Sequence, residues 1–100
     1  MPVSSAQARV DHPLGMHARP AMGFVDLAGR FGSVVKVSHD GYAAGPVDGK
    51  SIMHLMMLAA TQGTVLNIEA EGDDAEEAIG ALCAYVRGGF EDAEVAPAAE

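Results

Sequence analysis

The sequence predicts an α+β fold, an open-faced β-sandwich in which a four-stranded antiparallel sheet is covered on one face by three helices. Segments with alternating polar and apolar residues and segments with helical spacing follow one another in the order β-α-β-β-α-β-α. The connections between them are short, which favours antiparallel strands with the helices on one side of the sheet. A chain of 100 residues with 49% hydrophobic content can bury one core, so we expect one domain.

The first third of the chain predicts a strand, a loop and a helix. Apolar and polar residues alternate over 5–10, which is typical of a half-buried strand. The loop at 12–15 contains proline and glycine, which disfavour regular structure. From Ala21 to Phe31 apolar residues recur with helical spacing, and Gly32 can end this helix.

The middle of the chain predicts a hairpin followed by a short helix. Strands at 33–39 and 43–48 flank a turn. The Gly-Pro pair at 45–46 interrupts the second strand, so we expect an edge strand or a widened turn there. Ser51 is a suitable N-cap for the helix, and Gly63 would close it. Helical spacing predicts its core face as Ile52, Leu55, Met56 and Ala59.

The pattern of residues 66–89 predicts a strand at 66–71 and a helix that ends at the two glycines 88–89. Asp73 and Glu76 resemble a capping box at the start of this helix. The buried stripe of the helix includes Cys83, and a single cysteine excludes an intrachain disulfide.

Composition and charge exclude several classes of protein. The formal net charge is −8 with six Lys and Arg, so nucleic acid is not an expected partner. No apolar run reaches the roughly 18 residues needed to cross a membrane, and we expect a cytoplasmic protein. We place the domain at residues 1–90 and expect the acidic segment 91–100 to be a disordered tail. The histidines lack ligands at suitable spacing, so we expect no metal.

The segment 12–20 concentrates two histidines, an arginine and two prolines just before the first helix. Proline is tolerated in the first turn of a helix, so Pro20 places the helix start near His17. With His17 as N-cap, the N–H groups of Ala18 and Arg19 lack intrahelical partners and lie at the positive end of the helix dipole. Imidazole is a good nucleophile near neutral pH, and a guanidinium binds phosphoryl oxygens. These features predict a phosphorylated histidine.

Three segments resemble the HPr family, the histidine phosphocarriers of the phosphoenolpyruvate-dependent phosphotransferase system. They are residues 12–21 (HPLGMHARPA), 49–53 (GKSIM) and 55–60 (LMMLAA). The resemblance spans roughly residues 3–88 and implies a stoichiometric carrier rather than a turnover enzyme, with no cofactor. It implies that His17 accepts a phosphoryl group from phospho-enzyme I and passes it to enzyme IIA-type domains.

The same resemblance implies roles for two further residues. Arg19 matches the arginine that assists the phosphate. Ser51 matches a serine that a dedicated kinase/phosphorylase modifies in some members, which weakens phosphotransfer. An N-cap serine can carry a phosphate without disrupting its helix, and the added charge would repel an acidic partner.

A second apolar stripe lies opposite the predicted core face of the helix that follows Ser51. It consists of Met53, Met57 and Ala60. Two interpretations are open: the helix is buried on both sides, or the stripe is an exposed patch that adapts to several partners through flexible thioethers. We expect the patch, because a carrier docks on its donor and its acceptors through one face. Arg19, Arg30 and Lys50 would supply the basic rim of that face.

Alternative functions stay open within the same fold. Met16, Met22 and the sequence Gly-Phe-Glu at 89–91 resemble the nitrogen-related NPr branch, whereas 49–53 resembles the sugar-type HPr branch. A regulatory binding module that is not phosphorylated is a further alternative, in which His17 would be dispensable. We expect the protein to be a monomer.

Overall fold

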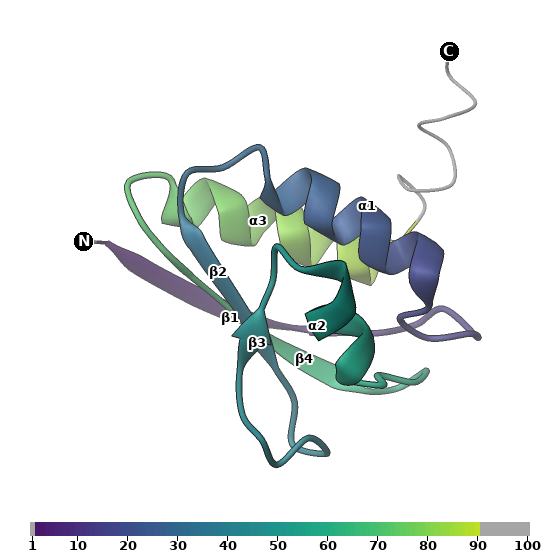
Figure 1. The fold of residues 1–100 in the computed structure, drawn as a ribbon. Coiled ribbons are helices and arrows are strands. Elements are labelled where there is room, and N and C mark those ends of the chain that lie inside the picture. Colours follow the sequence, from purple (N-terminus) through teal and green to yellow (C-terminus); the bar gives the residue numbers. More distant parts are fainter. Residues whose placement is uncertain (1, 91–100) are drawn as a thin grey trace.

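Four strands form one antiparallel sheet, and three helices cover one of its faces (Figure 1). The structure is a computed structural model that describes residues 2–90, so the predicted tail at 91–100 lies outside the described residues. The strands lie in the order β1-β4-β2-β3, and every neighbouring pair is antiparallel, which confirms the predicted fold class. The elements are β1 (Val3–Arg9), α1 (Ala18–Ala28), β2 (Val34–Ser38), β3 (Val47–Asp48), α2 (Ile52–Met57), β4 (Val65–Glu71) and α3 (Ala75–Arg87).

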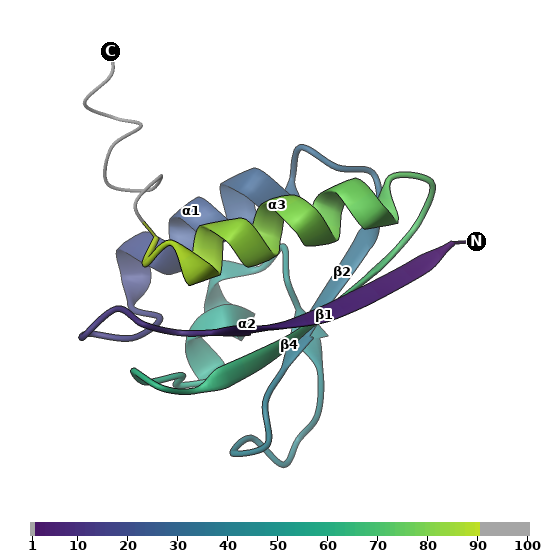
Figure 2. The same ribbon diagram turned by 180° about the vertical axis from the view of Figure 1, so that it is seen from behind.

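The sheet buries one face because its side chains alternate. In β4, an inner strand, Leu66, Ile68 and Ala70 are fully buried, whereas Glu69 and Glu71 are exposed on the outer face. Helices α1 and α3 lie side by side over the buried face (Figure 1 and, from behind, Figure 2), and α2 packs against α1. The helices fill the core with the large buried side chains of Phe24, Leu55, Leu82 and Val86 and with the buried thiol of Cys83.

Strand β3 is shorter than predicted. We expected a strand over 43–48, but only Val47–Asp48 pairs with β2. Pro46 has no N–H to donate to a ladder, and Gly45 adopts a φ of 96°, which bends the chain out of the strand. The strand lies at the edge of the sheet, as predicted.

Helix α2 is also shorter than predicted, and most of its predicted core face is wrong. The helix ends at Met57, and Ala59 is exposed with a left-handed φ of 52°. Leu55 is buried as expected, but Ile52 and Met56 are 37% and 47% exposed. A helix of six residues makes fewer than two turns, so a single buried side chain anchors it to the core.

The N-cap of α3 is Asp74 and not Asp73, and the Asp74 carboxylate makes no hydrogen bond to its own helix. It accepts hydrogen bonds from Gly32 N (2.8 Å), Ser33 N (3.0 Å) and Ser33 Oγ (2.5 Å). The connection between α1 and β2 is thereby tied to the start of α3. These hydrogen bonds lower the pKa of Asp74 because they favour its ionised form, and the bond from the Ser33 hydroxyl has the largest effect.

Strand β1 forms the other edge of the sheet. Its Gln7 carbonyl accepts a hydrogen bond of 2.7 Å from Nη2 of Arg87, the last residue of α3. On the outer face of the sheet, the Gln7 side chain donates to the side chain of Asn67 over 2.7 Å. The end of α3 is thus attached to the free edge of β1.

Candidate functional site

Helix α1 begins immediately after His17, which is its N-cap and has an extended backbone. The nitrogen of Ala21 donates to the carbonyl of His17 over 3.0 Å and closes the first turn. Pro20 therefore occupies the third helical position, as predicted, where no backbone donor is needed. The N–H groups of Ala18 and Arg19 have no hydrogen-bond partner within residues 2–90. Two donors at the positive end of the helix are available to an anion.

The loop that precedes the N-cap is fixed by hydrogen bonds within itself and to the segment after α2. Gly15 N donates to His12 O (2.9 Å), and Leu14 N donates to His12 Nδ1 (3.1 Å). Met16 N donates to Ala60 O (2.9 Å). Gly15 has a φ of 70°, and a Cβ at this position would collide with the backbone of Ala60. The position therefore requires glycine.

The imidazole of His17 is half-buried, and its two nitrogens have different surroundings. Nε2 is enclosed and has no hydrogen-bond partner among the described residues. The side chain makes no capping bond, and Nδ1 is not enclosed in this way. The ring of His12 packs beside it, with centroids 5.2 Å apart and planes inclined by 53°. Nδ1 is therefore the nitrogen that a reactant can reach.

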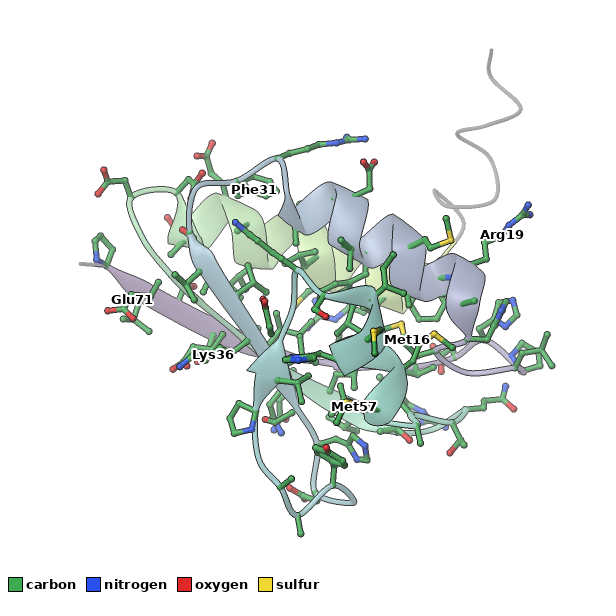
Figure 3. The ribbon with its side chains drawn as sticks, in the orientation of Figure 1. Met16, Arg19, Phe31, Lys36, Met57 and Glu71 are labelled. Carbon is green, nitrogen blue, oxygen red and sulfur yellow. The ribbon has the colours of Figure 1, made fainter. Side chains whose placement is uncertain are left out.

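Arg19 lies in the first turn of α1, beside these groups. Its side chain is exposed and extends outward from the start of the helix (Figure 3). Within residues 2–90 it has no ion-pair partner, and the first turn of α1 contains no acidic residue. A guanidinium, two unpaired amides and an open ring nitrogen form an arrangement that can bind the oxygens of a phosphoryl group.

Ser51 is the N-cap of α2, as predicted. Its Oγ accepts a hydrogen bond of 3.2 Å from His54 N, and its own nitrogen donates to Asp48 O over 3.2 Å. Nδ1 of His54 in turn accepts from Asp48 N over 3.3 Å. The half-buried serine therefore belongs to a closed turn in front of α2.

Four large exposed apolar side chains lie on α2, one on α1 and one in the loop before α1. Met53 and Met57 are 75% and 53% exposed, so the interpretation of α2 as a helix buried on both sides is wrong. Ala60 is 5% exposed and lies beyond the end of α2, so its predicted place on the exposed stripe is also wrong. Figure 3 shows Met57 on α2 and Met16 between α2 and the start of α1. We call the exposed set the apolar surface: Leu14, Met22, Ile52, Met53, Met56 and Met57.

Two of the three predicted docking cations lie near the far end of α1. Arg30 pairs with Asp26 over 3.3 Å, and both side chains are exposed. Nζ of Lys50 donates to Phe31 O over 2.8 Å. Because α1 has 11 residues, it is about 16 Å long, and the backbone of Arg30 and the carbonyl of Phe31 lie beyond the end opposite His17.

Phe90, which entered the sequence analysis only through the resemblance to the NPr branch, is completely buried beside the site. Its ring centroid lies 5.3 Å from that of Tyr85 and 6.2 Å from that of His12. The signal in the sequence is the pair of glycines after a helix followed by an aromatic residue. This pattern is typical of a helix end in which an apolar side chain folds back onto the last turn.

Residues 2–90 contain no group of three His, Cys, Asp or Glu side chains that could hold a metal ion. None of the described helices is long and apolar enough to span a membrane.

Comparison with known proteins relates the site to a family. Residues 4–87 match the family model described as PTS HPr component phosphorylation site. The phosphocarrier protein HPr of Pseudomonas aeruginosa is 44% identical over 81 residues, which cover 81% of this chain and 88% of that protein. The phosphocarrier protein NPr of Proteus mirabilis is 40% identical over 84 residues, which cover 83% and 90%. The crystal structure of HPr-C-His from Thermoanaerobacter tengcongensis superposes with a TM-score of 0.81 at 40% identity and covers 88% of this chain and 96% of that one.

Proposed function

The chain belongs to the HPr family of phosphocarriers of the phosphotransferase system, and from this premise we propose that Nδ1 of His17 accepts a phosphoryl group from phospho-enzyme I and passes it to enzyme IIA-type domains in the cytoplasm. The observation that carries this proposal is the environment of His17. One ring nitrogen is enclosed, the other is open, and two unpaired N–H groups follow it at the start of α1.

The transfer needs no cofactor on this chain. The lone pair of Nδ1 attacks phosphorus, and the N–P bond forms as the bond between phosphorus and the donor's leaving group breaks. The leaving group departs with the electron pair of that bond. The ring keeps its proton on Nε2, and the dianionic phosphoryl group offsets the positive charge that the ring acquires. In the second transfer an acceptor nucleophile attacks the same phosphorus, and the electron pair of the N–P bond returns to Nδ1.

The N–H groups of Ala18 and Arg19 and the guanidinium of Arg19 would donate to the phosphoryl oxygens. Donors that are already in place before the reaction need no reorganisation when charge develops. Each such donor typically contributes about 100- to 1000-fold to the rate of a reaction. The helix end stabilises the phosphoryl group without a fixed counter-charge, which suits a group that must leave again.

The apolar surface is the proposed docking site for both the donor and the acceptors. Met53 and Met57 are its most exposed members on α2, and thioether side chains adapt to partners of different shape. Ala60 is left out because it is buried. Arg30 and Lys50 would act at the rim of the contact, mainly on the rate of encounter. We propose that the carrier docks as a monomer.

Ser51 is the proposed regulatory site for a serine kinase/phosphorylase. A phosphate on its Oγ would add about 1.5 to 2 negative charges next to the helix that carries Met53. These charges would weaken docking of an acidic partner. We expect Ser51→Asp to raise the KM for phosphorylation by enzyme I, whereas Ser51→Ala leaves it unchanged. An equal KM for both variants would contradict this role.

The test of the main proposal is incubation of the full chain with enzyme I and labelled phosphoenolpyruvate. We expect an acid-labile label that is absent from His17→Ala and present in the control His54→Ala, because His54 lies at α2. Label retained by His17→Ala would overturn the proposal. Absence of label from the wild-type chain would favour a binding module that is not phosphorylated.

The nitrogen-related branch is the second candidate, supported by the identity to an NPr protein. We expect a carrier of either branch to react faster with the enzyme I of its own branch. Comparison of kcat/KM with a sugar-type and with a nitrogen-related enzyme I separates them, since the cognate donor should react faster.

A further inference from the structure

We infer that Phe90 is a positioning residue for His17 and that it acts through the ring of His12. The inference rests on the proposed function, because it concerns the histidine that receives the phosphoryl group. Phe90 lies outside residues 4–87, the part of the chain that matches the family model. Three observations support it: the backbone of Phe90, a row of ring contacts, and the unpaired nitrogen of His17.

The backbone after α3 bends so that Phe90 turns back toward the protein. Gly88 is the C-cap of the helix, Gly89 has a φ of 72°, and Phe90 has a φ of 65°. A residue with a Cβ seldom occupies this left-handed region, because the Cβ crowds a carbonyl oxygen. Packing must hold it there. The nitrogen of Phe90 donates to Tyr85 O over 3.1 Å, and its side chain is completely buried.

A row of ring contacts runs from α3 to the candidate phosphorylation site. The ring of Tyr85 lies 5.3 Å from that of Phe90, with planes inclined by 60°. The ring of Phe90 lies 6.2 Å from that of His12, inclined by 43°. The ring of His12 lies 5.2 Å from that of His17, inclined by 53°. All three separations fall in the range at which tilted aromatic rings attract one another.

The end of α3 also holds the first turn of α1. The hydroxyl of Tyr85 donates to Pro20 O over 3.1 Å, and this hydrogen bond is buried. Phe90 contacts His12 in the loop before His17, whereas Tyr85 binds the turn that follows it. Two neighbouring aromatic residues thus restrain the chain on both sides of the reactive histidine.

The ring of His17 needs such a restraint because its buried nitrogen lacks a hydrogen bond. An attacking nitrogen must point at phosphorus, and a misplacement of about 1 Å can lower a rate by about 100-fold. In many proteins a hydrogen bond to the other ring nitrogen fixes the orientation of a reactive imidazole. Nε2 of His17 has no such partner within residues 2–90. Packing against His12, itself held by Phe90, fixes the ring instead.

The test compares Phe90→Leu with Phe24→Leu, the same change at another completely buried phenylalanine. In phosphorylation by enzyme I with the full chain as the varied substrate, we expect Phe90→Leu to lower kcat about 10-fold and leave KM within about two-fold. Phe24→Leu should leave both within about two-fold. The ¹⁵N signals of the His17 ring in the unphosphorylated chain should shift in Phe90→Leu and not in Phe24→Leu.

A double-mutant cycle tests whether the effect passes through His12. We expect Phe90→Leu to cause no further fall in kcat in a His12→Ala background, because the intermediary is already absent. The inference would be overturned if Phe90→Leu and His12→Ala lowered kcat independently, so that their fold-changes multiplied in the double variant. It would also be overturned if Phe90→Leu and Phe24→Leu had the same kcat and the same His17 ring signals. If Phe90→Leu does not fold, Phe90→Met keeps more apolar volume and is tested in the same way. If enzyme I does not phosphorylate the wild-type chain, the proposed function fails, and the His17 ring signals still decide the positioning role.

Discussion

The two ends of helix α1 differ in how their polar groups are satisfied. Beyond the C-terminal end, the carboxylate of Asp74 accepts three hydrogen bonds from the connection to β2, and Nζ of Lys50 donates to a carbonyl there. At the N-terminal end, the N–H groups of Ala18 and Arg19 and Nε2 of His17 have no partner within residues 2–90. We call the C-terminal end of α1, where the polar groups are paired, the closed end, and the N-terminal end, where they are not, the open end.

This difference separates stability from function along a single helix. A buried polar group without a partner is costly, and most such groups in folded proteins are paired. The closed end follows this rule and ties α1, β2 and α3 together. At the open end, the buried Nε2 of His17 departs from it, and the N–H groups of the exposed residues Ala18 and Arg19 are available to a phosphoryl group. Changes at the open end should affect transfer, and changes at the closed end should affect stability.

The largest effect is expected at the open end from Ala18→Pro. This change removes one of the two N–H donors at a position where proline fits a helix, and His17 already has the extended backbone that precedes proline. We expect kcat for phosphorylation to fall about 100-fold, with little change in thermal stability. Ala18→Ser keeps the N–H group and is the control. Wild-type activity of Ala18→Pro would contradict a role for this amide.

A smaller effect is expected on the apolar surface. Met53→Asp should raise the KM for phospho-enzyme I about 10-fold, because a charge replaces an exposed apolar contact, while the circular dichroism spectrum stays unchanged. The control is Val65→Asp, which places the same charge on an exposed apolar position of β4, opposite Arg9. Equal KM values for the two variants would show that docking does not use α2.

At the closed end, Ser33→Ala should affect stability and not transfer. Its hydroxyl donates to Asp74 and is buried, so we expect the free energy of unfolding to fall by about 1 kcal/mol. For a domain of this size, that corresponds to a melting temperature lower by about 4–8 °C. The kcat for phosphorylation should stay within about two-fold of wild type. A larger fall in kcat would show that the closed end also affects transfer.

The smallest effect is expected from the ionisation of Asp74. The pKa of Asp74 is lowered in the folded protein, mainly by the hydrogen bond from the Ser33 hydroxyl. The ionised carboxylate therefore makes its full contribution to stability above the ordinary pKa of aspartate. The contribution is lost as the pH falls through the lowered value. Urea unfolding from pH 7 to below pH 3 should show a stability gap between wild type and Asp74→Asn that narrows below about pH 4. A gap independent of pH would contradict this assignment.

The open end of α1 could be predicted from the sequence because local rules determine it. Proline is restricted to the first helical turn, so Pro20 fixes the helix start, and the helix start fixes which N–H groups lack partners. No information about distant residues is needed for this step. The order of the strands and helices follows in the same way from alternating and helical patterns.

The closed end and the faces of α2 could not be predicted in this way, because tertiary contacts determine them. The capping-box pattern falls on Asp73, yet Asp74 is the N-cap of α3, and its carboxylate accepts hydrogen bonds from Gly32 and Ser33, which lie 42 and 41 positions away in the sequence. Ile52 and Met56 have the spacing of core residues, yet a short helix buries Leu55 alone. Phe90 reaches the site through a left-handed turn, whose direction apolar spacing does not encode.

The bond between Arg87 and the Gln7 carbonyl has a consequence for solubility. The free edge of a sheet can recruit a strand from another molecule and start aggregation, and natural proteins protect such edges with charged side chains. The guanidinium of Arg87 occupies one of the backbone acceptors along the free edge of β1 and places a charge beside it. At this point of the edge, Arg87 reduces the chance that β1 recruits a strand from another copy.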